Sequence, residues 1–227
     1  MKAMNTKLII GTMAAFLAPL VAHAISFDIH NVSGTSQPTS ANLHFLGDTT
    51  FTFDDATTGV GSGHDFIVNS TSGAGDAFGL YGNISGTFTV GPSSGGAIES
   101  ATVTSSPGAT LSIFDGVNTF SGLINWITLV RDDTSGNLNI AGAVNLTGIT
   151  YSGTVADLIA LKGANNSASS VINFTFNPAL SINDLRTQNV KTSYSGDITS
   201  VPDAGGTVML LGLALSGIAL VRNRIRA

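Results

Sequence analysis

The stretch ISFDIHNV, residues 25–32, places apolar side chains at every second position, at Ile25, Phe27 and Ile29. Successive side chains of a β-strand point to opposite faces, so this alternation predicts a strand with one buried face and one solvated face. The same period recurs along the chain. It is found in FTFDD, GTFTVG and TLSIFDG (residues 51–55, 86–91 and 110–116), with further candidates in INWITLV, NLNIAGAVNLTGITYSGTV and SVINFTFNPAL (residues 124–130, 137–155 and 170–180).

Turn-forming residues separate these candidate strands. Gly, Asn, Asp, Ser and Pro gather in VGPSSGG, SSPGA and RDDTSGN, residues 90–96, 105–109 and 131–137. Many short strands at this spacing predict an all-β fold, an antiparallel β-sandwich or a jelly-roll-like body. Helical spacing is found in VADLIALKGAN, residues 155–165, and a second short helix is compatible with residues 182–188.

The first 24 residues differ from the rest. Lys2 and Lys7 precede an apolar run over residues 8–21, and Ala22-His23-Ala24 offers a small residue on each side of a cleavage-site position. A basic flank, a short apolar run and such a site, in this order, are typical of a secretory signal peptide. We therefore expect signal peptidase to cut after Ala24, which divides the chain into a signal peptide (1–24), a β-rich extracellular body (25–200) and a C-terminal segment (201–227).

Charge and cysteine content exclude several functions for the body. Residues 25–200 hold 13 acidic and four basic side chains, a net charge of about −9. Binding to nucleic acid needs clustered Lys and Arg, so nucleic acid is not an expected partner. The chain has no Cys, which excludes disulfides, thiol catalysis and cysteine metal sites, and the fold must rest on its hydrophobic core.

Paired carboxylates would indicate a glycosidase, because these enzymes use two of them. The candidates are Asp54-Asp55 and Asp132-Asp133, but adjacent acids on a strand point to opposite faces, and both pairs fit turns at strand ends better. Asp132, Asp133, Ser135 and Asn137 also offer oxygen ligands suited to calcium, although the stretch does not fit the EF-hand pattern. We therefore assign no metal site and no cofactor.

Histidines and aromatic residues supply the remaining candidates. His64 beside Asp65 is the one possible catalytic dyad, while His30, His44 and His64 show no metal-binding spacing, and a solvent-facing strand or turn histidine is the simpler interpretation. Trp126, Tyr81, Tyr151 and Tyr194 suggest a sugar-stacking face, although β-sandwich cores also use lone aromatic residues. No catalytic residue is assigned from these patterns.

The C-terminal segment is VPDAGGTVMLLGLALSGIALVRNRIRA, residues 201–227. Its uncharged stretch, residues 207–221, would span about 22 Å as a helix, short of a hydrocarbon core of about 30 Å. Arg222, Arg224 and Arg226 follow at once and predict a cytoplasmic end. A recognition site, a short hydrophobic helix and a basic end form the layout of a sorting signal with a single, short transmembrane helix.

This segment resembles the sorting domain of PEP-CTERM proteins, and closely its VPD variant, VPDSG-CTERM. The matching residues are Val201, Pro202, Asp203, Gly205 and Thr207, followed by the apolar stretch and the three arginines; Ala204 stands where that motif has Ser. The resemblance implies export, at least transient anchoring in the membrane through the C-terminal helix, and processing by an exosortase-like membrane enzyme. It also implies a place at the cell surface or in the extracellular matrix of a bacterium that makes exopolysaccharide.

The expected function is therefore a structural or adhesive, non-enzymatic role in an exopolysaccharide-rich envelope, with exopolysaccharide as a candidate partner of the body. The alternative is a secreted glycan-binding module or glycosidase whose acids come from distant loops. Two carboxylates roughly 5–10 Å apart in a cleft, or an exposed row of Trp and Tyr, would favour that alternative.

Overall fold

The structure is a computed structural model that describes residues 24–32, 42–56, 61–132, 139–163, 166–174 and 180–200. Residues Ala24–Val201 form one compact unit. The predicted signal peptide and the predicted sorting signal with its transmembrane helix lie outside the described residues. Within the described part of the chain, no helix is long and apolar enough to cross a membrane.

Strands dominate the described residues, and each predicted alternating stretch contributes to one. The strands are β1 (Ser26–Asn31), β2 (Leu43–Leu46), β3 (Thr50–Phe53), β4 (Phe66–Thr71), β5 (Tyr81–Ser85), β6 (Phe88–Val90), β7 (Ser94–Gly95), β8 (Ile98–Ser105), β9 (Thr110–Phe114), β10 (Thr119–Asp132), β11 (Asn139–Thr150), β12 (Ala168–Phe174), β13 (Asn189–Thr192) and β14 (Tyr194–Ser200). The helices are α2 (Ala156–Lys162) and α3 (Ile182–Thr187), at the two places where the sequence allows a short helix.

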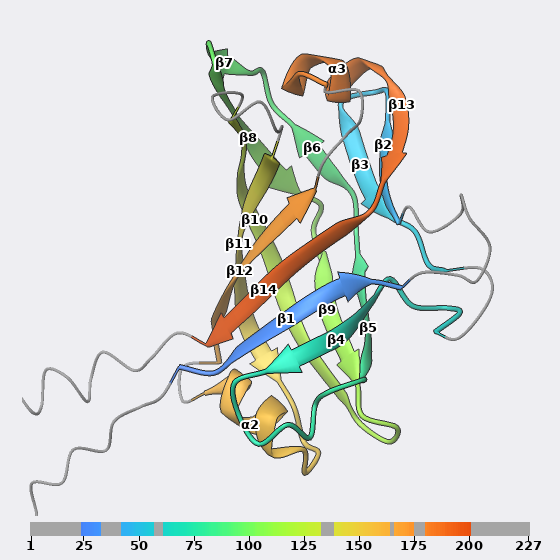
Figure 1. The fold of residues 1–227 in the computed structure, drawn as a ribbon, viewed down its shortest axis with the longest axis vertical. Helices are drawn as coiled ribbons and strands as arrows, with labels where there is room; N and C mark the ends of the chain where they lie inside the picture. The colour runs from blue at the N-terminus through green and yellow to red at the C-terminus, as the bar shows by residue number, and fades with distance from the viewer. Residues whose placement is uncertain are drawn as a thin grey trace, which may run out of the picture. The chain divides into compact units, whose positions relative to one another are not determined.

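All strand pairs are antiparallel, and eight of the described strands close into a barrel (Figure 1). Going round, β10, β11, β12, β14, β1, β4, β5 and β9 pair in this order, and β9 pairs with β10 again. This ring is called the closed sheet below. The all-β antiparallel prediction is confirmed, but the strands are not divided into the two separate sheets of a sandwich or jelly roll.

The closed sheet also carries a second row of strands. The start of β10 pairs with β9 through residues 119–123, whereas its end pairs with β8 through residues 128–132. From β8 the row continues through β6, β3, β2 and β13. A strand of 14 residues reaches both rows, and two register shifts in its pairing with β11 bend it between them.

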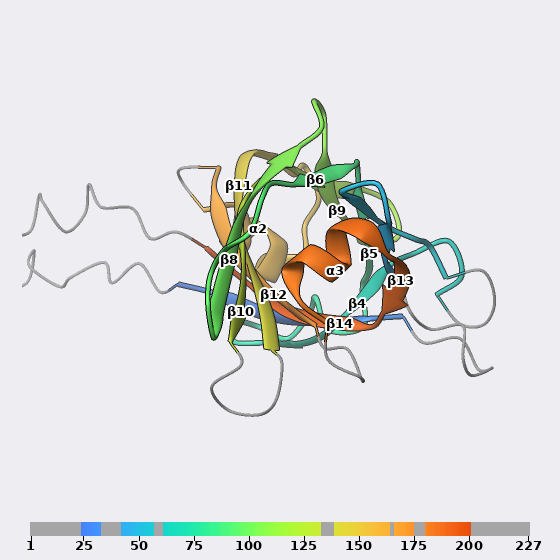
Figure 2. The same cartoon turned by 90° about the horizontal axis from the view of Figure 1, so that it is seen from above.

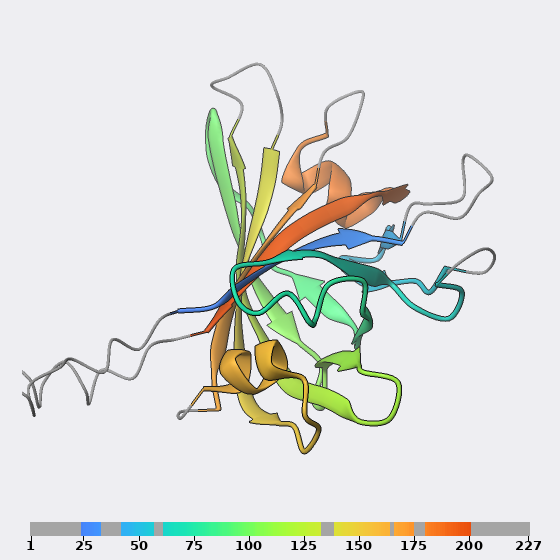
Figure 3. The same cartoon turned by 60° about the horizontal axis from the view of Figure 1, so that its bottom comes forward.

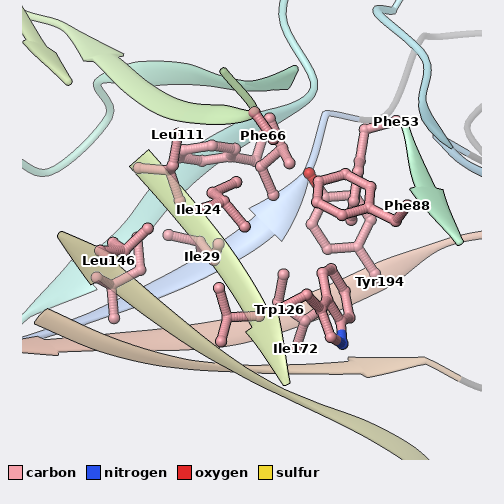
Figure 4. Packing of buried hydrophobic residues seen from close by; sticks show 14 of the residues in the cluster. Ile29, Phe53, Phe66, Phe88, Leu111, Ile124, Trp126, Leu146, Ile172 and Tyr194 are labelled. Carbon is pink, nitrogen blue, oxygen red and sulfur yellow. The ribbon is translucent and has the colours of Figure 1, made fainter. Parts of the chain in front are cut away.

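A single apolar core lies between these strands. Phe27 and Ile29 of β1, predicted to face inward, are fully buried. Figure 4 shows Ile29, Ile124 and Leu146 packing in one part of this core and Trp126 beside Phe88 and Tyr194 in another. Aromatic rings at centroid distances of 5.0–6.2 Å link the two rows of strands, because Phe51 and Phe53 of β3 both contact Trp126 of β10 and each other.

The two short helices lie at opposite ends of the body (Figures 1 and 2). Seen from above, α3 crosses the end formed by β2, β6 and β8, and its Ile182 and Leu185 are buried. A capping box of Ser181 and Asp184 begins α3. At the other end, α2 buries Leu158 and Leu161. Each helix therefore buries apolar side chains where the strands end.

Candidate functional site

The strongest candidate for chemistry in the body is a group of polar side chains around Asp65, which we call the Asp65 cluster: His44, Asp54, Asp55, His64, Asp65, Asn83 and Lys191. They come from five parts of the chain. Asp54 and Asp55 follow β3, His64 and Asp65 precede β4, Asn83 belongs to β5, and His44 and Lys191 belong to β2 and β13. The cluster brings together two of the acid candidates recognised in the sequence.

Asp65 is the buried member of the cluster, with an exposed fraction of 1%. One carboxylate oxygen, Oδ2, accepts a short hydrogen bond from the backbone N–H of Ile84. The other, Oδ1, has no hydrogen-bond donor among the described residues, and the carboxyl group of Asp55 lies beside it. For a buried carboxylate, one donor for two oxygens compensates poorly for the lost hydration.

This environment makes Asp65 a weak acid. Burial raises the pKa of Asp65 to about 8, and the neighbouring carboxyl groups of Asp55 and Asp54 add to the rise, while the N–H of Ile84 opposes it. Nearby carboxyl groups add to the cost of ionising Asp65. Asp65 is therefore protonated near neutral pH.

The predicted dyad of His64 and Asp65 does not form. His64 Nδ1 lies 2.7 Å from Asn83 Oδ1, and its ring stacks on Tyr81 with centroids 5.4 Å apart. Asn83 Nδ2 in turn donates to Asp55 Oδ1 at 3.0 Å. Because neighbouring side chains in extended backbone point apart, the imidazole and the carboxylate of adjacent residues have different partners.

Asp54 and Asp55 also face different partners, as expected for adjacent acids. Asp54 Oδ2 lies 2.6 Å from Lys191 Nζ and 3.1 Å from His44 Nδ1, whereas Asp55 binds Asn83. Both residues directly follow β3, which confirms their interpretation as strand-end residues. The remaining histidine, His30, is exposed and lies 3.2 Å from Asp28. The Asp132 to Asn137 calcium candidate falls largely outside the described residues, and nothing is concluded about it.

Of the two interpretations of the aromatic residues, the sugar-stacking face is excluded. Trp126, Tyr151 and Tyr194 are buried, and the indole N–H of Trp126 donates to the carbonyl oxygen of Thr128 at 3.0 Å. Only Tyr81 is partly accessible, and His64 covers it. The aromatic residues serve the core, which was the other interpretation of the sequence. Among the described residues, no three His, Asp or Glu side chains gather as a metal site.

A second polar group, which the sequence did not indicate, lies at the α2 end. We call it the Asp157 clamp. Asp157 of α2 is 1% exposed, and its carboxylate accepts from Thr71 Oγ1 (2.8 Å) and from the backbone N–H groups of Ala74 (2.6 Å), Gly75 (2.9 Å) and Ala77 (3.2 Å). In return, Asp76 accepts from the N–H groups of Ala156 (2.7 Å) and Asp157 (3.0 Å) at the start of α2.

The Asp157 clamp locks one loop to one helix. Burial by itself would raise the pKa of Asp157, but the hydroxyl of Thr71 and the three backbone donors outweigh burial and lower it. Asp157 is therefore ionised at neutral pH, and both of its carboxylate oxygens accept hydrogen bonds from the protein. The sequence signal was the acid in the first turn of a short helix, but its partners lie more than 80 positions away.

The predicted sorting residues, Val201, Pro202, Asp203, Gly205 and Thr207 with Arg222, Arg224 and Arg226, lie outside the described residues, as does Ala22 of the predicted signal-peptide site. Ala24, after which signal peptidase is expected to cut, is the first described residue. Comparison with known families nevertheless tests the tail. Residues 200–225 match the family model described as the VPDSG-CTERM motif. The chain carries a VPDSG-CTERM signal. Neither a search of curated proteins nor a search of solved structures gave a match for the chain.

The VPDSG-CTERM signal supports a secreted protein that is sorted through its C-terminus and associated with the cell surface. It is consistent with an exosortase as the processing partner. The matched segment covers only the tail, so it assigns no activity to the body. The geometry of the body has to be considered separately.

Proposed function

We propose that the chain is an exported surface or extracellular-matrix protein whose body has a structural or adhesive role in an exopolysaccharide-rich envelope. The observation that carries this proposal is the VPDSG-CTERM signal at residues 200–225, directly after the last strand of the body. In this proposal, signal peptidase removes residues 1–24. The apolar tail then anchors the chain transiently, and an exosortase-like enzyme cuts near Pro202-Asp203.

The polar contacts of the body support a non-enzymatic role. Its well-buried acid, Asp157, holds a loop, and the carboxylates of Asp76, Asp115 and Asp184 bind backbone N–H groups of turns and helix starts. Groups occupied in this way hold backbone in place and are not free to act on a substrate. Binding to exopolysaccharide would then rest on many weak surface contacts.

Processing is tested by mass spectrometry of the protein isolated from the surface fraction of its native host. We expect a mature chain that begins at Ile25 and ends within residues 201–203. A Pro202→Ala/Asp203→Ala variant should stay unprocessed and remain with the membrane, whereas Asp197→Asn, an exposed change in β14, should be processed normally. Recovery of Arg226 in the surface fraction would show that the tail is a permanent anchor.

Matrix association is tested by sedimenting the processed protein with exopolysaccharide purified from the host. Co-sedimentation without release of new reducing ends is the expected result. A glycosidase or other hydrolase would instead release such ends.

One observation favours the alternative of a glycosidase: Asp65 has the raised pKa expected of a general acid. However, Asp65 is only 1% exposed, whereas a general acid must reach the glycosidic oxygen of its substrate. Release of reducing ends that an Asp65→Asn variant no longer produces would establish this alternative.

A further inference from the structure

The two ends of the body leave the fold side by side. β1 and β14 are antiparallel neighbours, with Ser26 opposite Thr199. Ile25 N–H donates to Ser200 Oγ at 2.9 Å, and Ser200 N–H donates to the carbonyl oxygen of Ile25 at 2.9 Å. The segments before residue 25 and after residue 200 therefore begin at adjacent points on one end of the body.

That end also carries α2 and the loop of residues 72–79 (Figure 3). Ser72 Oγ accepts from Ser26 N–H at 2.8 Å, and Ser72 N–H donates to the carbonyl oxygen of Ser26 at 2.9 Å. The Asp157 clamp then ties the same loop to α2. We call the region made of Ile25, Ser26, Ser200, the loop 72–79 and α2 the terminal end.

Two large apolar side chains are exposed on the terminal end. Phe78, in the loop, is 65% exposed, and Ile159, on α2, is 52% exposed. The Asp157 clamp fixes the backbone that carries both of them, because Asp157 accepts from Ala77 N–H and Asp76 caps the first turn of α2. They are therefore presented to solvent on ordered segments with little backbone freedom. Ile98, which is 55% exposed in β8, provides a comparable side chain near the opposite end, beside β7.

The length of the tail brings this end close to any membrane that the tail enters. Only residues 201–206 separate Ser200 from the uncharged stretch that starts at Thr207. A fully extended chain covers at most about 3.6 Å per residue, so these six positions reach about 22 Å. The terminal end is then the part of the body held nearest to the bilayer.

We propose that the terminal end is a membrane-contact surface, whose partner is the lipid bilayer that holds the tail. Phe78 and Ile159 enter the interfacial layer and keep the body end-on, with the Pro202-Asp203 segment at the membrane surface. Aromatic and aliphatic side chains on a rigid support are suited to this layer. This inference rests on the proposed insertion of the tail.

The test uses the full-length chain in vesicles of phosphatidylcholine and phosphatidylglycerol at a ratio of about 3:1. The sequence contains no Cys, so a single introduced Cys carries the only dye. Phe78→Cys and the control Ile98→Cys are labelled with the same environment-sensitive dye, and quenching by lipids with a bromine or spin label in the upper acyl chain is measured. We expect at least about threefold stronger quenching at position 78 than at position 98.

Co-flotation of the same samples with the vesicles measures tail insertion independently. Chains that do not float would contradict the proposed anchoring. Chains that float but show equal quenching at positions 78 and 98 would overturn the membrane-contact surface and leave the anchoring intact. Shielding of the dye at position 78 that rises with protein concentration, without lipid quenching, would also overturn it and would assign this surface to contact with a second copy.

A matched variant separates contact from tether length. Lengthening the linker by about 12 Gly and Ser residues after Val201 frees the body to turn. With the longer linker, quenching at position 78 should persist if the surface that carries position 78 and Ile159 binds lipid, and it should fall with Ile159→Ser. Quenching that disappears with the longer linker in the unaltered background would show that the tether alone holds the end near the membrane, which contradicts the proposal.

Discussion

The body contains two buried aspartates that differ in the groups around their carboxylates. Asp65 and Asp157 each have an exposed fraction of 1%. Burial raises the pKa of Asp65 to about 8, whereas the pKa of Asp157 is lowered although burial acts against it. Asp157 has four donors on its two carboxylate oxygens, and Asp65 has one donor and an acidic neighbour.

The comparison shows that hydrogen-bond donors can outweigh the effect of burial on the charge of a carboxylate. Backbone N–H groups can replace the lost water because each one stabilises the ionised form. In the Asp157 clamp, an ionised carboxylate therefore holds the loop in place. In the Asp65 cluster, by contrast, Asp65 is uncharged near neutral pH. A bound proton takes the place of the missing hydrogen-bond donors.

The largest expected effect on stability comes from removing the carboxylate of the Asp157 clamp. Asp157→Ala removes the acceptor of one hydroxyl and three backbone N–H groups, and we expect the free energy of unfolding to fall by about 4 kcal/mol. Asp157→Asn should cost less than Asp157→Ala, because its amide oxygen still accepts hydrogen bonds. It should still lower stability, because its NH₂ group would face donors. Urea unfolding measures both values, and hydrogen exchange of Ala74, Gly75 and Ala77 locates the change. A loss no greater than that of the exposed control Asp197→Ala would contradict the clamp.

The second effect is a pH dependence that the two aspartates impose with opposite sign. The pKa of Asp65 is raised above its ordinary value of 3.8 to about 8, so the folded state keeps a proton that the unfolded chain releases, and stability falls as pH rises from about 4 to about 8. The pKa of Asp157 is lowered, so its contribution is lost on acidification below its ordinary value. We therefore expect maximal stability near pH 4–5.

Asp65→Asn isolates the alkaline part of this dependence. Its amide oxygen can accept from Ile84 N–H, and its NH₂ group can donate to Asp55 without a titrating proton. At pH 8 this variant should be more stable than the parent by about 2 kcal/mol, and its stability should be nearly flat between pH 5 and 8. Thermal unfolding over this range measures the slope. An unchanged slope would show that Asp65 is ionised in the folded protein.

The sequence predicted seven of the 14 described strands, β1, β3, β6, β9, β10, β11 and β12, because their signal is local. Alternation at Ile25, Phe27 and Ile29 needs no knowledge of the partner strand, and the buried positions follow from it. Closure of the sheet depends on how β10 divides its length between β9 and β8. That division is a property of register and of two bulges, which the alternation in β10 does not reveal.

The candidate site was predicted only in part for the same reason. Asp54, Asp55, His64 and Asp65 were recognised as titratable groups, but adjacency in the sequence suggested the wrong partners. Asp65 instead meets Asp55 through folding, and His64 meets Asn83 across 19 positions. The sequence does not predict the role of Asp157, because three of its four donors are backbone N–H groups, which no residue type marks.

The smallest expected effect concerns the other half of the Asp157 clamp. Asp76 caps α2 from outside the helix, since the N-cap residue Val155 offers no side-chain cap. Asp76→Ala should lower the free energy of unfolding by about 1 kcal/mol, the usual cost of a lost cap, and Asp76→Asn should recover most of it by keeping an acceptor. Asp184→Ala, which removes the corresponding contacts at α3, should cost a similar amount. If the double variant loses no more than Asp157→Ala alone, the two halves act as one unit.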